Sequence, residues 1–147
     1  ESFRGAVFFG TPHRGSPLAS AFDRPVLGTT LKLSAAVSEL SYGAAHLEKL
    51  DEDFQRIVRS LHIEDEILSF AEGISTQIGG VRGVPLMTYI VPPETAFAGV
   101  GHFEFIPGVD HIRICKPLTS LDKRYTLIRD VIARSCAKNH GNPSSPI

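Results

Sequence analysis

Residues 5–9, Gly-Ala-Val-Phe-Phe, form a continuous apolar run that ends abruptly in Gly10-Thr11-Pro12-His13. A short apolar run without polar alternation is typical of a strand buried on both faces. The Gly and Pro residues directly after it indicate a tight loop. The order of the expected elements along the chain, a strand, helices, three strands and a helix, predicts the α/β class.

The remaining elements follow from apolar spacing and turn residues. Helices are expected over residues 31–40 and 47–61, and the second carries an amphipathic stripe of Leu47, Leu50, Phe54, Ile57, Val58 and Leu61. Strands are expected over residues 67–70, 86–91 and 103–107, with a Gly-rich loop over residues 73–85. A last helix is expected to begin at an N-cap on Thr119 or Ser120. These elements form one domain over residues 1–138, followed by a Pro/Ser/Gly-rich tail, residues 139–147, that we expect to be disordered.

Composition excludes several classes of function. The 15 Lys and Arg residues are balanced by 16 Asp and Glu residues, which leaves no basic excess for nucleic acid. No uninterrupted apolar stretch approaches the length of a transmembrane helix. Two cysteines cannot form a disulfide scaffold, which favours a reducing compartment. No Cys/His spacing matches a structural zinc site, so no metal and no cofactor is expected.

Polar residues follow three of the expected strands, at the end of the sheet where open α/β folds place their sites. Glu72 ends one strand, and Asp110-His111 follows the last. A carboxylate followed by a histidine on successive strands fits the acid and the base of a nucleophile–His–acid triad. The nucleophile is missing, because no Gly-x-Ser-x-Gly motif occurs in the sequence. Ser16 follows Gly15 but precedes Pro17, which gives no strained strand-to-helix turn.

Each of these residues also has a structural interpretation. His111 fits a loop histidine with a structural hydrogen bond, and Glu72 fits a surface carboxylate. Asp110 is expected to hold its loop by accepting backbone N–H groups. His13 and Arg14 either line the pocket of this site or belong to a turn beside it. Cys115 follows Ile114, an apolar setting that indicates a buried, unreactive thiol rather than a nucleophile.

Four motifs in order carry a family resemblance over residues 3–135. They are Gly5–Ser16, Leu47-x-x-Leu50-x-x-x-Phe54 with Ser69-Phe-Ala-Glu72, Ile90-Val-Pro-Pro-Glu-Thr-Ala96, and Val109-Asp-His-Ile-x-x-Cys-Lys-Pro117. Together they resemble the C-terminal half of the serine active-site-containing protein family of lipase-like hydrolases. A related module occurs in fungal proteins with NTPase or ankyrin repeat regions, and GPI inositol-deacylases are more distant relatives.

The resemblance implies the C-terminal part of an α/β-hydrolase sheet, with a helical cap region inserted between the first two strands. It implies a serine hydrolase acting on a carboxylic ester or lipid, with His111 as the triad histidine. The serine is expected in a segment before Glu1, so the chain alone is expected to be inactive. A parent protein with NTPase or repeat regions is also implied. Relatives point to an intracellular location in the cytoplasm, mitochondrion or endoplasmic reticulum.

Three alternatives remain open from the sequence. Glu94 competes with Glu72 as the triad acid, and Glu72 is preferred because it ends a strand. The stripe along residues 47–61 is expected either to pack on the core or to form a substrate lid, since its mixed charges do not suit anionic lipid. Instead of an enzyme fragment, the chain fits a non-catalytic hydrolase-like module for interaction or regulation.

Overall fold

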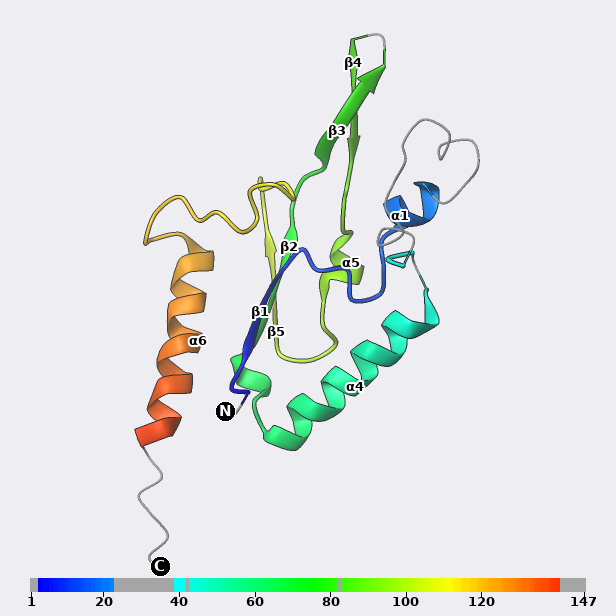
Figure 1. The fold of residues 1–147 in the computed structure, drawn as a ribbon. Coiled ribbons are helices and arrows are strands. Elements are labelled where there is room, and N and C mark those ends of the chain that lie inside the picture. The colour runs from blue at the N-terminus through cyan, green and yellow to red at the C-terminus, as the bar shows by residue number, and fades with distance from the viewer. Residues whose placement is uncertain (1–2, 23–38, 42, 82, 141–147) are drawn as a thin grey trace, which may run out of the picture.

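The computed structural model describes residues 3–22, 39–41, 43–81 and 83–140. Three parallel strands form the main sheet in the order β1–β2–β5 (Figure 1). These are β1 (Ala6–Phe9), β2 (Ile67–Glu72) and β5 (His102–Ile106). Every residue of the central strand β2 is buried, as expected for a strand flanked on both edges and covered on both faces. A parallel sheet combined with helices places the chain in the α/β class.

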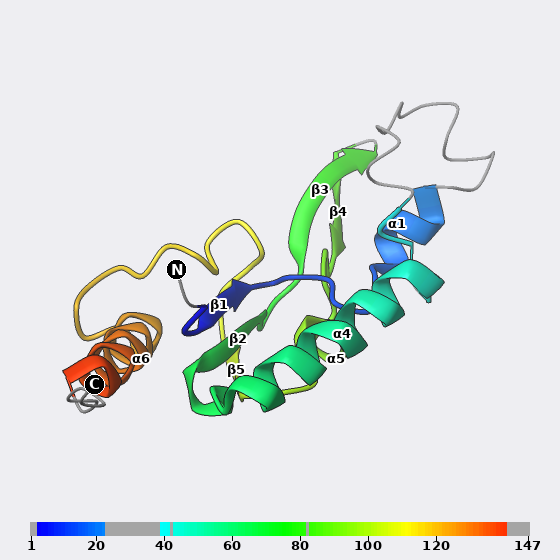
Figure 2. The same cartoon turned by 60° about the horizontal axis from the view of Figure 1, so that its bottom comes forward.

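The two long helices, α4 (Ala45–Leu61) and α6 (Lys123–His140), lie on opposite faces of the sheet (Figure 2). Val58 and Phe54 of α4 pack against Phe8 and Ile67 on one face. On the other face, α6 contributes Val131 to a cluster with Leu68, Phe70, Ile106 and Ile114. Successive strand residues thus reach opposite cores, which explains why the strands read as unbroken apolar runs.

In the described residues, the helical region between β1 and β2 contains α1 (Pro17–Phe22) and α4, followed by a short 3₁₀ turn before β2. The stripe predicted for α4 is covered only in part. Val58 is fully buried, whereas Leu50, Ile57 and Leu61 are 65%, 52% and 47% exposed. Most of the helix predicted for residues 31–40 lies outside the described residues, and its last residue, Leu40, lies in a turn.

The predicted loop over residues 73–85 is wrong. This segment forms most of an antiparallel hairpin, β3 (Thr76–Val81) and β4 (Val84–Thr88), which extends beyond the main sheet (Figure 1). The expected strand 86–91 correspondingly begins earlier and ends at Thr88. The glycines in this segment led to the prediction of a loop. At Gly80, however, a Cβ atom would come within 3.0 Å of the Val84 carbonyl oxygen on the neighbouring strand. Glycine here allows close approach of two strands rather than ending one.

Two short helices complete the fold: the 3₁₀ turn η1 (Glu64–Glu66) before β2, and α5 (Pro93–Ala96) after the hairpin. No helix among the described residues is long and apolar enough to cross a membrane.

Both ends of α6 differ from the sequence prediction. The helix begins at Lys123 rather than after Thr119 or Ser120, and Asp122 accepts the backbone N–H of Arg124 at 3.0 Å. The Asp122 carboxylate therefore serves as the cap. The helix ends at His140, so the first two residues of the predicted tail are helical, and residues 141–147 lie outside the described residues.

Candidate active site

Glu72 and His111 lie together at the carboxyl ends of the neighbouring strands β2 and β5. Glu72 is the last residue of β2, and His111 follows β5 by five residues. The connecting loops are tied together at Val109, whose carbonyl oxygen accepts the backbone N–H groups of Gly73 at 2.8 Å and Ile74 at 3.3 Å. This link fixes the loop that carries His111 against the residue that follows Glu72.

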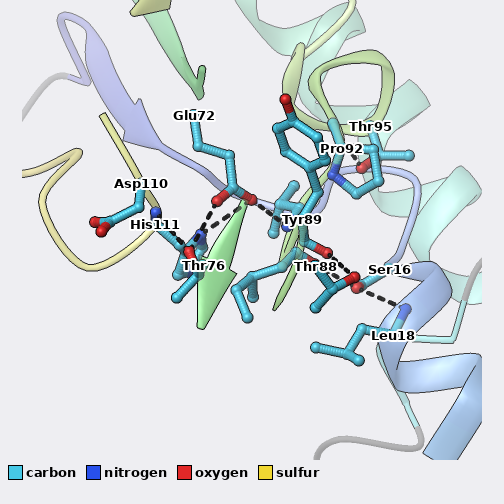
Figure 3. A network of polar contacts seen from close by, with 12 residues as sticks. Ser16, Leu18, Glu72, Thr76, Thr88, Tyr89, Pro92, Thr95, Asp110 and His111 are labelled. Atoms are coloured by element: carbon cyan, nitrogen blue, oxygen red, sulfur yellow. Dashed lines mark hydrogen bonds and ion pairs between the residues drawn. The ribbon is translucent and has the colours of Figure 1, made fainter. Parts of the chain in front are cut away.

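The Glu72 carboxylate is completely buried and held by two groups. Its Oε1 atom accepts the backbone N–H of Val91 at 2.6 Å, and its Oε2 atom accepts the Thr76 hydroxyl at 3.3 Å (Figure 3). A buried carboxylate is costly unless hydrogen bonds replace its lost hydration. The Val91 backbone and the Thr76 side chain supply them, so Glu72 is not the surface carboxylate of the structural alternative.

Thr76, at the start of β3, connects the two predicted site residues. Its hydroxyl donates to Glu72 and accepts the backbone N–H of His111 at 3.0 Å. The Thr76 side chain is itself buried. Sequence reasoning missed this residue because it falls in the Gly-rich segment that was predicted to be a loop. Thr76 lies four residues after Glu72 in the sequence. Predicting the hairpin correctly would have placed it at the start of a strand, close to the end of β2.

The His111 imidazole is partly exposed and faces Glu72. Its Nδ1 atom lies 3.7 Å from Glu72 Oε1, beyond hydrogen-bond distance, and has no hydrogen-bond partner among the described residues. Gly10 makes room for the ring: a Cβ atom there would come within 2.9 Å of Nδ1, and the Gly10 backbone has a φ of +53°. The loop after β1 is thus shaped to accept His111, and glycine is required for both reasons.

The structure separates Glu94 and Asp110 from this pair. Glu94 is exposed on α5 and has no hydrogen bond or ion pair among those found for the described residues. Asp110 accepts the backbone N–H of Arg113 at 2.9 Å and pairs with its guanidinium, and its carboxylate points away from Glu72 (Figure 3). The hydrogen bond to the Arg113 side chain holds the pKa of Asp110 below its usual value. The prediction that Asp110 holds its loop is confirmed.

Ser16 is buried at the start of α1, with its hydroxyl donating to the Ile90 carbonyl oxygen at 2.5 Å. Ser16 Oγ also accepts the backbone N–H of Leu18 at 3.2 Å. In Figure 3 it lies beside Leu18 and beyond Thr88 and Tyr89, whereas Thr76 and His111 lie together beside Glu72. These bonds give Ser16 a structural role that joins α1 to the segment after β4.

The predicted burial of Cys115 is wrong. Cys115 is exposed, whereas its neighbour Ile114 is buried in the core. Of these two side chains, only that of Ile114 lies in an apolar environment. Among the residues that the structure describes, no three His, Cys, Asp or Glu side chains gather closely enough to hold a metal ion.

His13 forms a second histidine–carboxylate pair on the α4 side of β1. Its Nδ1 lies 3.6 Å from Asp51 Oδ1, and its ring meets Phe8 edge-on with centroids 4.6 Å apart. Burial lowers the pKa of His13, although Asp51 opposes the shift. His13 belongs to the turn after β1 and lines a cavity of about 440 Å³ whose lining includes neither Glu72 nor His111. A role for His13 in the pocket of the Glu72–His111 site stays a prediction. Nothing in the sequence indicated its pairing with Asp51 across 38 positions.

Fold and site together define an α/β protein with a buried carboxylate and a histidine at adjacent strand ends. Comparison with protein-family models gives no match, and neither a curated protein nor a solved structure matches the chain significantly.

Proposed function

We propose that this chain supplies the acid and the histidine of a serine hydrolase that cleaves carboxylic esters, including lipid esters. The observation that carries the proposal is the position of buried Glu72 within 3.7 Å of His111 Nδ1, on neighbouring strands of a parallel sheet. Carboxylate and imidazole in this arrangement fit a triad that still lacks its nucleophile. The hydrolase fold and the helical cap between β1 and β2 belong to the same proposal.

In this mechanism, the Nε2 atom of His111 takes the proton of a serine hydroxyl as the serine oxygen attacks the ester carbonyl. Glu72 orients the ring through Nδ1 and stabilises the imidazolium. His111 then gives the proton to the alcohol that leaves, and an acyl-serine remains. Water attacks the acyl group with His111 again as base, releases the acid and restores the serine. Backbone N–H groups near the serine would stabilise the oxyanion.

The 3.7 Å separation is compatible with this role. Catalytic hydrogen bonds are often long before substrate is bound and tighten in the reacting complex. Glu72 already has fixed bonds to Val91 and Thr76, so closure requires a small movement of the partly exposed imidazole rather than of the buried carboxylate.

The serine is proposed to come from outside these 147 residues. The sequence contains no Gly-x-Ser-x-Gly motif, and the Ser16 hydroxyl is engaged by Ile90. One edge of β1 is unpaired within the described sheet, which leaves room for a further parallel strand. A serine on the strand beside β1 would lie at the same end of the sheet as His111.

Labelling with a serine-directed fluorophosphonate tests the proposal. The 147-residue chain is expected to remain unlabelled. A chain extended at its amino end through the genomic sequence preceding Glu1 is expected to be labelled and to hydrolyse p-nitrophenyl esters. His111→Ala is expected to abolish hydrolysis, and His102→Ala on β5 is the matched control. Labelling of the short chain at Ser16, or full activity of His111→Ala, contradicts the proposal.

The second candidate is a non-catalytic hydrolase-like module for interaction or regulation. It is favoured by one observation: Val91, not His111, makes the short hydrogen bond to Glu72 Oε1. Under this function Glu72 is a structural carboxylate that anchors the segment after β4. An extended chain without a nucleophile serine, and without ester hydrolysis, would favour it.

A further inference from the structure

The hydrogen bonds of the buried Thr76 hydroxyl have a defined direction. The backbone N–H of His111 can only donate, so the Thr76 oxygen accepts it at 3.0 Å. The hydroxyl proton then needs an acceptor of its own. Glu72 Oε2, at 3.3 Å, is the one acceptor found for it among the described residues. The Thr76 proton therefore points to Glu72 (Figure 3).

The two bonds to Glu72 match an ionised carboxylate. Its Oε1 atom accepts the backbone N–H of Val91 at 2.6 Å, and its Oε2 atom accepts the Thr76 hydroxyl. An ionised carboxylate only accepts hydrogen bonds, whereas a protonated carboxyl group has a proton to donate. Both oxygens of Glu72 thus face donors, and the charge lies next to the His111 ring.

His111 Nδ1 is the ring nitrogen that faces this carboxylate. It is buried, and it lies 3.7 Å from Glu72 Oε1 with the Gly10 backbone packed against it. A nitrogen lone pair beside a carboxylate oxygen is repelled, whereas an N–H group is attracted. In the neutral ring the proton therefore belongs on Nδ1, which leaves the lone pair on Nε2.

We propose that Thr76 is a positioning residue: it holds the His111 backbone beside the ionised Glu72 carboxylate, with the ring proton on Nδ1. One side-chain oxygen bonds both partners, so a single residue sets the separation between them. Thr76 begins β3 and pairs with Thr88 across the hairpin, which anchors its side chain. The catalytic consequence rests on the proposed function, because a base at Nε2 needs the proton on Nδ1.

Nitrogen NMR of the 147-residue chain tests the geometry without any need for catalysis. In the neutral form of His111, the ¹⁵N shifts should identify Nδ1 as the protonated nitrogen and Nε2 as the unprotonated one. This measurement needs no variant. The His111 backbone amide should exchange with solvent at least tenfold faster in Thr76→Val, which removes its acceptor, than in the unmodified chain or in Thr76→Ser.

Ester hydrolysis by the amino-terminally extended chain tests the positioning role. Thr76→Val should lower kcat about 10- to 100-fold, because the ring is no longer held in place. KM should change less than twofold, since the buried Thr76 side chain does not reach the substrate. Thr76→Ser should recover most of the lost kcat. The matched control is Val58→Ala, which weakens the core beneath α4 and should change kcat less than twofold.

Four results would overturn the proposal: an Nε2–H tautomer in the unmodified chain, unchanged amide exchange in Thr76→Val, unchanged kcat in Thr76→Val, or an equal loss of kcat in Val58→Ala. The last would make Thr76 a stabilising residue only. If the extended chain does not hydrolyse esters at all, the proposed function fails. The tautomer and the amide exchange then still decide whether Thr76 positions His111.

Discussion

Replacing Thr76 with valine removes the hydroxyl that joins Glu72 to the His111 backbone without changing the side-chain shape. The backbone N–H of His111 and one oxygen of buried Glu72 then lose a partner each. An unsatisfied buried polar group costs about 1–3 kcal/mol, and the bond to Glu72 is long at 3.3 Å. We therefore expect Thr76→Val to lower the free energy of unfolding by about 2–4 kcal/mol.

Urea unfolding measures this change, with two comparisons. Thr76→Ser retains the hydroxyl and is expected to recover at least half of the loss. Thr88 pairs with Thr76 across the hairpin, and its hydroxyl contacts only the Tyr89 carbonyl oxygen among the described residues. Thr88→Val is therefore expected to cost less than about 0.5 kcal/mol. Equal stability of Thr76→Val and the unmodified chain, or equal losses in the valine and serine variants at residue 76, would refute the reasoning.

Three further predictions concern charge and local geometry. Because burial lowers the pKa of His13 below its ordinary 6.5, the unfolded chain binds the proton more readily. The free energy of unfolding should fall as the pH drops below about 6.5, and His13→Gln should flatten that fall in urea titrations. Asp122→Ala removes the cap of α6 and the partner of buried Arg124, so it should cost about 2–3 kcal/mol by the same assay. Gly10→Ala should cost about 1–3 kcal/mol and shift the His111 ring resonances, because its Cβ meets that ring.

The sequence alone predicted that the site lies at the carboxyl ends of the strands. The runs before Gly10 and Glu72 are apolar on both faces, and such runs are typical of covered parallel sheets, so their ends were expected to meet at one edge. The choice of Glu72 over Glu94 rested on the same logic, and the structure brings only Glu72 to His111. Its catalytic role stays a prediction.

The hairpin and Thr76 were not predictable for a physical reason. Glycine is found both in loops and in strands that approach each other closely. The sequence alone therefore did not show which of the two Gly79 and Gly80 form. The pairing of His13 with Asp51 could not be predicted because it depends on how α4 packs against β1. No local sequence pattern determines that packing. The start of α6 was missed because Thr119, Ser120 and Asp122 are all good caps.

The central claim is that Glu72 orients His111 for catalysis, and the rate of ester hydrolysis by the amino-terminally extended chain tests it most directly. Glu72→Gln is close in shape but removes the charge, and it should lower kcat by about 10²–10⁴-fold. Glu94→Gln should change kcat less than twofold. If Glu72→Gln hydrolyses esters at the unmodified rate, or if Glu94→Gln loses as much activity, Glu72 is not the triad acid.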